Sequence, residues 1–150
     1  MMARTFDITP ASATPFIFIS AICLLLILLI GFFAFMVYSI RNTKFEVGEP
    51  GLRIRGGLYG RFIPKENLVD QSVKIINLNQ QKEYQPRLRT NGVGLPGYSE
   101  GWFKLRNDEK ALLFVTDRSN VVYIPTNQNY SVLLSVSNTE EFYQATKQWK

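Results

Sequence analysis

Four basic residues that could bind anions lie within a short stretch of the sequence, and they are Arg53, Arg55, Arg61 and Lys65. Arg53 and Arg55 alternate with apolar residues, so a strand here has one basic face and one apolar face. Arg61, on the strand that follows, can join them, and Lys65 comes just after that strand. Such charges contact anionic lipid at roughly 1 kcal/mol per residue near a membrane surface. The alternative is a solvated strand face with no ligand.

A glycine-rich segment at 91–97 contains the spacing G-x-G-x-x-G. The residues of interest are Asn91, Gly92, Gly94 and Gly97. In dinucleotide-binding proteins such glycines open a helix whose N-terminus holds a pyrophosphate. Here Pro96 favours a turn, and residues 99–105 are predicted to form a strand. We therefore expect a flexible connection, with contact to a ligand through backbone amides as the alternative.

Residue types that commonly catalyse reactions or bind metals are scarce. The chain has no histidine, which removes the commonest general base and metal ligand. Its one cysteine, Cys23, lies in an apolar segment, and the acidic pairs 108–109 and 140–141 fit a turn and the first turn of a helix. We therefore predict no enzymatic activity, no metal, no cofactor and no small-molecule substrate. Nucleic acid is excluded too, because no broad basic face or reader motif is present.

An apolar segment precedes the basic residues. Residues 16–40 contain no charged side chain, and as a helix they would reach roughly 38 Å, more than the hydrocarbon thickness of about 30 Å. A cleaved signal peptide is the alternative, but its apolar core is about 7 to 15 residues long and ends in small residues. We predict an N-terminal tail at 1–15, a single transmembrane helix at 16–40 and a juxtamembrane linker at 41–45.

Charges beside this segment predict the side of the membrane on which the rest of the chain lies. Arg4 is the only lysine or arginine that precedes the segment. Four basic residues follow it closely, namely Arg41, Lys44, Arg53 and Arg55. Because basic flanks tend to remain in the cytoplasm, this count favours a cytoplasmic domain at the cell membrane. Export remains an alternative, since a short tail with little charge is easily placed on either side.

The remaining sequence predicts one mainly β domain at 46–150. Short runs of β-branched, aromatic and leucine residues alternate with turns. The predicted strands are 52–56, 58–63, 73–78, 84–89, 101–105, 111–116, 121–124 and 130–136. Residues 137–140 match the S-x-x-E capping box of a helix start. Phe142, Ala145 and Trp149 then share one helical face, which we expect to cover an open end of the β structure.

Four stretches of this domain resemble the bacterial branch of the pleckstrin-homology-like (PH-like) group. They are IRGGLYGRFIP at 54–64, RTNGVGLPGYSEGWFKL at 89–105, ALLFVTDRSNVVYIPT at 111–126 and SNTEEFYQATKQ at 137–148. The resemblance implies a partly open β-barrel of about seven strands with a C-terminal capping helix. Similar bacterial domains are often attached to membrane helices. Eukaryotic relatives bind phosphoinositides through basic residues near the first strands, but this sequence lacks a clear match to their motif.

Together these features predict a non-catalytic, membrane-anchored module that binds the membrane surface or a protein partner. Arg53, Arg55, Arg61 and Lys65 would contact anionic lipid. The alternative is a structural subunit that self-assembles into a homo-oligomer, or completes a larger membrane complex, through exposed sheet edges. Gly31 and Ala34 add a small-residue spot to the apolar segment that fits helix association.

Overall fold

The computed structural model describes residues 7–10 and 12–149 of the chain. Arg4 and part of the predicted tail at 1–15 lie outside these residues. The chain divides into two compact units, residues 1–41 and residues 42–150. The second unit has its own hydrophobic core.

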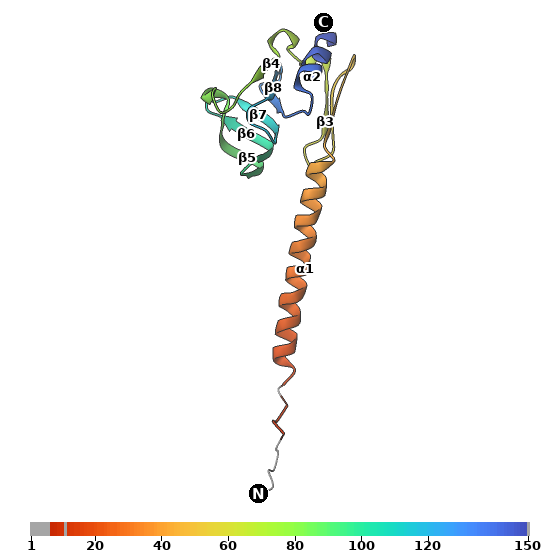
Figure 1. Cartoon of the computed structure of the whole chain (residues 1–150), viewed down its shortest axis with the longest axis vertical. Helices are drawn as coiled ribbons and strands as arrows, with labels where there is room; N and C mark the ends of the chain where they lie inside the picture. The colour runs from red at the N-terminus through yellow and green to blue at the C-terminus, as the bar shows by residue number, and fades with distance from the viewer. Residues whose placement is uncertain (1–6, 11, 150) are drawn as a thin grey trace. The chain divides into compact units, whose positions relative to one another are not determined.

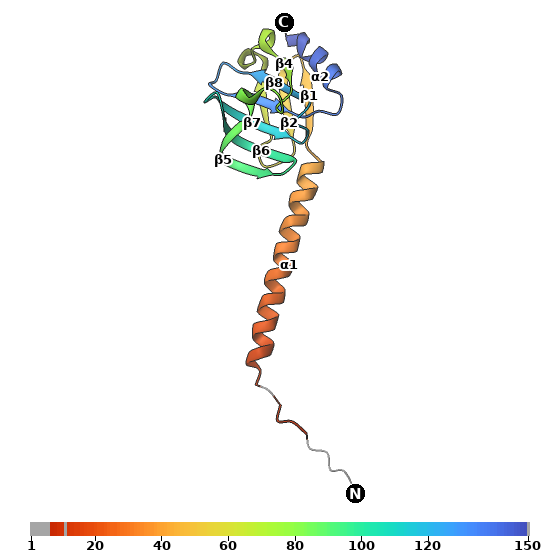
Figure 2. The same cartoon turned by 60° about the vertical axis from the view of Figure 1, so that its left-hand side comes forward.

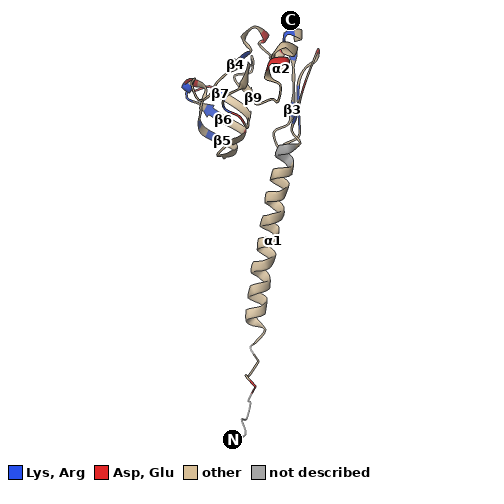
Figure 3. Cartoon of the chain, in the orientation of Figure 1, with Lys and Arg blue, Asp and Glu red and all other residues tan. Residues whose placement is uncertain are grey.

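The first unit is dominated by one helix, α1 (Thr14–Arg41). Its span Thr14–Tyr38 contains no charged residue, and in Figure 3 the ribbon of the described part of that span carries neither the blue of Lys and Arg nor the red of Asp and Glu. At about 1.5 Å per residue the helix exceeds the hydrocarbon thickness of a bilayer. By length and composition, α1 is therefore able to cross a membrane, as the sequence predicts.

The second unit begins with a three-stranded antiparallel sheet. Its strands are β1 (Lys44–Gly48), β2 (Gly51–Arg55) and β3 (Arg61–Pro64), in the order β1-β2-β3. A two-residue turn joins β1 to β2, and residues 56–60 join β2 to β3. Alternating side chains give this sheet one buried face and one exposed face.

A six-stranded sheet lies against the first (Figures 1 and 2). Its strands are β4 (Lys74–Ile76), β5 (Pro86–Leu95), β6 (Tyr98–Leu105), β7 (Lys110–Val115), β8 (Val121–Pro125) and β9 (Ser131–Leu134). Their spatial order is β4-β8-β9-β7-β6-β5, and only β7 and β9 pair in parallel among the described strands.

Two hydrophobic cores stabilise the unit, one on each face of the six-stranded sheet. The inner core lies between the sheets and includes Leu52, Ile63, Leu112, Val122 and Leu134. The outer core includes Ile76, Leu78, Phe103, Leu113 and Leu133. Residues 77–85, with Leu78 and Tyr84, contribute to this outer core, so the central strands β7, β8 and β9 are buried on both faces, whereas β5 at the edge is largely exposed.

The C-terminal helix α2 (Thr139–Thr146) packs beside β1 (Figure 2). Its N-cap is Asn138, whose side chain accepts a hydrogen bond from the Glu141 N–H, so the predicted capping box at 137–140 is displaced by one residue. A 3₁₀ turn, Lys147–Trp149, follows. Trp149 is buried, and its indole N–H donates to the Gly48 carbonyl at 2.9 Å.

The structure confirms a mainly β domain with a C-terminal helix and a preceding apolar helix, but it corrects several details. The described residues form nine strands rather than about seven. β1 begins at Lys44, inside the segment predicted as a linker. The predicted strand 58–63 is shorter, because residues 56–60 form the turn before β3.

The glycine-rich segment is also corrected, since it is mostly strand. Asn91, Gly92 and Gly94 lie in β5, and the connection to β6 is only the turn Pro96–Gly97. Gly97 has a φ of +75°, which a type II turn requires at this position. A Cβ at Gly92 would lie 2.2 Å from the Glu100 carbonyl oxygen, so this glycine allows the two strands to approach closely.

Candidate functional site

The exposed face of the three-stranded sheet carries most of its charged side chains. The register pairs Lys44 with Arg55 and Glu46 with Arg53, so these four side chains share one face. Phe62 of β3 pairs with Arg53 and joins the same face, where it is 43% exposed. We call these five residues the outer basic face. Its three basic residues and one acidic residue give a formal charge of +2.

Two contacts organise the outer basic face. Arg55 Nε lies 2.9 Å from Glu46 Oε1, an ion pair in which both side chains are about half exposed. Arg53 lies over the Phe62 ring, 5.3 Å from its centroid, as in a cation–π contact. Among the described residues, neither Arg53 nor Lys44 forms an ion pair with a carboxylate. These two cations are therefore the most available for an external anion.

Arg61 does not join this face, contrary to the prediction. It pairs with Ile54, a residue of the inner core, and so it points to the opposite side of the sheet. Its guanidinium lies 4.8 Å from the centroid of the Trp102 ring, and its Nε is buried without a hydrogen-bond partner in the described part of the chain. Lys110 contacts the same ring at 4.4 Å. Arg61 thus packs within the domain rather than on the outer basic face.

Lys65 is exposed, but it lies at the far end of the sheet. Its N–H bonds to the Pro50 carbonyl, in the turn between β1 and β2. Lys44 and Arg55 lie at the other end of that hairpin, about 13 Å away along the strand. Of the four predicted basic residues, Arg53 and Arg55 therefore lie together on the outer basic face, and Lys65 lies apart from them. Lys44, which is not among the four, also lies on this face. The sequence prediction of the lipid-contacting residues does not include Lys44. Its stretch nevertheless has the period of a strand, because the charged residues Lys44 and Glu46 alternate with the apolar residues Phe45 and Val47.

The glycine segment lies apart from the outer basic face, in the other sheet. Asn91 accepts a hydrogen bond from the Tyr59 hydroxyl at 2.9 Å. Gly92 faces Gly101 across the β5–β6 pair, and Gly94 faces Ser99. Because strand pairing occupies this segment, it does not form the flexible loop that the sequence predicts.

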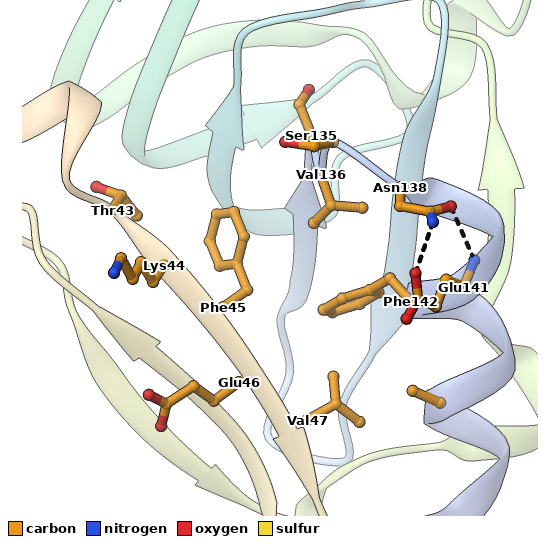
Figure 4. A pocket seen from close by; sticks show the side chains of 12 residues that line it. Thr43, Lys44, Phe45, Glu46, Val47, Ser135, Val136, Asn138, Glu141 and Phe142 are labelled. Carbon is orange, nitrogen blue, oxygen red and sulfur yellow. Dashed lines mark hydrogen bonds between the residues drawn. The ribbon is translucent and has the colours of Figure 1, made fainter.

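A groove separates β1 from α2 (Figure 4). Its volume is about 570 Å³, and its apolar lining includes Phe45, Val47, Val136 and Phe142. Asn138 and Glu141 lie on its helical side, joined by two hydrogen bonds. The groove is open, and its lining also includes Lys44, Glu46 and Glu141. An open groove with this mixture of apolar, polar and charged groups fits a polypeptide better than a small molecule, which is usually enclosed in a mostly apolar pocket.

The free edge of β1 contributes to this groove. Gly48 and Gly51 close a two-residue turn as a bonded pair, and bonded and non-bonded pairs alternate along the hairpin. The backbone N–H and C=O groups of Phe45 and Val47 therefore point away from β2. A free edge of this kind can pair with another strand.

Residues 43–149 match the family described as Bacterial PH domain. This match covers more than half of the chain, and the chain belongs to the bacterial PH domain family. Comparisons with curated proteins and with solved structures gave no significant match. The two sheets are not closed into a complete barrel, in agreement with the partly open PH-like barrel that the sequence predicts. PH-like domains are generally non-catalytic.

Proposed function

We propose that this protein is a non-catalytic, membrane-anchored PH module whose outer basic face contacts anionic lipid headgroups. The observation that supports this function is the placement of Lys44, Arg53 and Arg55 on one exposed face of the first two strands. Only residues 42 and 43 separate α1 from β1. If α1 crosses the bilayer, the chain itself holds this sheet near the headgroups, within about 10 Å at its first residue.

The expected binding is weak and depends on salt. Each basic residue near an anionic surface contributes on the order of 1 kcal/mol, which corresponds to roughly fivefold in affinity. Arg55 contributes less than Lys44 and Arg53, because Glu46 already neutralises part of its charge. Because α1 provides the attachment, these charges orient the domain on the membrane rather than recruit it.

Vesicle binding by residues 42–150 tests this function. The fragment starts at 42 because β1 is part of the domain, and circular dichroism would first verify that it folds. We expect more retention on phosphatidylglycerol-containing vesicles than on pure phosphatidylcholine at low salt. The variant K44Q/R53Q/R55Q should lose roughly 25-fold or more in affinity, because the loss is about fivefold each at Lys44 and Arg53 and smaller at Arg55.

A matched control removes three charges elsewhere. Lys82, Arg106 and Arg118 are exposed and lie in or beside the residues that cover the outer core. The variant K82Q/R106Q/R118Q has the same change in net charge, and we expect it to bind nearly as well as the unmodified fragment. Equal losses in the two triple variants would mean that only net charge matters. Equal retention by neutral and anionic vesicles would rule out the lipid contact.

We further propose that the domain lies in the cytoplasm. Gln128 is exposed in the turn before β9, and a cysteine there in a Cys23→Ser background provides a labelling site. An impermeant thiol reagent should fail to label position 128 in intact cells and should label it after lysis. Labelling in intact cells would place the domain outside and remove the inner leaflet as its ligand.

A second candidate function is the binding of an extended protein segment along β1. The free edge groups of Phe45 and Val47, beside the apolar groove, favour strand addition. A photo-crosslinking residue at Lys44 should then capture a partner in native membranes, and Val47→Pro should reduce the capture, because it removes an edge N–H while preserving the β1–β2 ladder. The mass of the product distinguishes another protein from a second copy of this chain. Unchanged capture by the proline variant would exclude strand addition.

A further inference from the structure

The turn between β2 and β3 presents a leucine to solvent. We call residues 56–60 the hairpin tip, and its sequence is Gly-Gly-Leu-Tyr-Gly. Leu58 is 75% exposed, the largest exposed fraction among the large apolar side chains described in residues 42–149. The tip thus combines an apolar side chain with glycines that add no bulk around it.

The hairpin tip is fixed rather than loose. The Leu58 N–H donates to Glu100 Oε1 at 3.2 Å, and Glu100 is only 6% exposed. Glu100 also accepts a hydrogen bond from the Tyr98 hydroxyl. Gly57 has a φ of +68°, a left-handed conformation that favours glycine, and a Cβ there would lie 2.2 Å from Glu100 Oε1, so a larger residue would have to displace this carboxylate. The backbone of Leu58 is therefore held against β6 while its side chain stays in solvent.

The tip lies at the end of the domain where the chain arrives from α1. A Cβ at Gly56 would lie 2.9 Å from the Asn42 carbonyl oxygen, which shows how closely these backbones approach. Next to this contact, Lys44 pairs with Arg55. An exposed leucine, a lysine and an arginine therefore lie beside residue 42, the first residue after α1.

We propose that Leu58 inserts into the interfacial region of the bilayer that α1 crosses, with Lys44 and Arg55 contacting headgroups beside it. This inference rests on the proposed function, because it requires α1 to span the membrane. An apolar side chain with basic neighbours matches the interface, where apolar groups enter about 5–10 Å and cations bind anionic lipid. Chain continuity favours the bilayer over a protein as the occupant, because Asn42 cannot lie far from the end of α1.

Depth-dependent quenching in the full-length chain tests the insertion. The protein carries Cys23→Ser and Leu58→Cys, is labelled with an environment-sensitive fluorophore, and is reconstituted into vesicles of phosphatidylcholine and phosphatidylglycerol. The matched control is Leu88→Cys, because Leu88 is 56% exposed and lies on β5 of the other sheet. Brominated acyl chains should quench position 58 roughly threefold more than position 88, as expected for a site within the interface. Aqueous iodide should show the reverse order.

The outcomes separate this inference from the proposed function. Equal quenching at positions 58 and 88 would overturn the insertion, even if the triple charge variant still lost vesicle binding. Strong lipid quenching at 58 that persists in pure phosphatidylcholine would support the insertion even if charge proved unimportant. As a second measurement, Leu58→Asp should reduce lipid quenching of a fluorophore at Phe62→Cys, whereas Leu88→Asp should not. Equal effects of the two aspartates would also overturn the insertion.

Discussion

The three-stranded sheet leaves its outer face exposed, whereas the six-stranded sheet buries a second core on its own outer face. On the smaller sheet, Lys44, Arg53 and Arg55 alternate with core residues. On the larger sheet, β7, β8 and β9 are buried on both sides. Residues 77–85 help to bury that outer core with Leu78 and Tyr84. One sheet thus offers a surface for contact, and the other contributes chiefly to stability.

This difference is visible in the sequence of each strand. Residues 44–47 and 52–55 alternate between polar and apolar types, as expected when one face meets water. Residues 111–115 and 131–134 are almost continuously apolar, as expected when both faces are covered. Substitutions on the two outer faces should therefore separate stability from binding.

The largest effect is expected from the covered face. Leu78 is 1% exposed, and Leu78→Ala should lower the free energy of unfolding by about 2–5 kcal/mol, through lost burial and a cavity. Leu88→Ala, on an exposed leucine, should change it by about 0.5 kcal/mol or less. Urea denaturation of residues 42–150 measures both. Similar losses of unfolding free energy in the two variants would contradict the expected difference between a buried and an exposed leucine.

An intermediate effect concerns alkaline pH. The Tyr123 hydroxyl donates to Glu109 and accepts from Ser131, and burial, with the nearby Glu109 charge, raises the pKa of Tyr123 to about 12. An unfolded tyrosine has a pKa of about 10, so the unfolded state ionises first. Stability from this group is therefore complete below about pH 10 and is lost as the pH rises toward 12.

Tyr123→Phe tests this dependence. The variant cannot ionise, so its free energy of unfolding should fall less steeply between pH 10 and 12 than that of the unmodified domain. Tyr98 should preserve part of the slope, because burial and the adjacent Glu100 also raise its pKa. Denaturant titrations across this pH range provide the measurement. Identical slopes would show that Tyr123 does not contribute.

The smallest effect on stability is expected from a substitution on the outer basic face. Arg55→Gln removes an ion pair with Glu46 whose partners are both about half exposed, so the free energy of unfolding should change by less than about 1 kcal/mol. The same variant should weaken binding to anionic vesicles. A loss comparable to that of Leu78→Ala would show that the face is structural.

Most of the fold could be predicted from local patterns. The eight predicted strands correspond to β2 through β9. They could be predicted because runs of β-branched and aromatic residues between turns are typical of strands. β1 is missed because its five residues follow directly on the long apolar segment, which makes them resemble a linker. The partners of the strands, including the parallel pairing of β7 with β9, depend on contacts between distant residues, which local patterns do not contain.

The candidate site was predictable only in part. The placement of Arg53 and Arg55 on one exposed face could be predicted, because these residues alternate with apolar residues within one strand. Arg61 is misplaced because the face of a residue depends on its strand register, and a shift of one position reverses that face. Without the register there is no means to know that Arg61 pairs with Ile54. The glycines at 91–97 suggest a loop, yet Gly92 serves the close approach of two strands.

The hydrogen bond from Trp149 to Gly48 joins residues 101 positions apart. During synthesis, the ribosome must therefore add about a hundred residues after the first strand before this contact can form. Such long-range closure makes the late stages of folding slow and leaves the early chain open to mispairing. Throughout that interval the first strand lacks its contact with the C-terminal residues, while the apolar helix that precedes it has already been synthesised. Insertion of the helix can thus precede folding of the domain, so that the nascent domain folds beside a bilayer rather than in free solution.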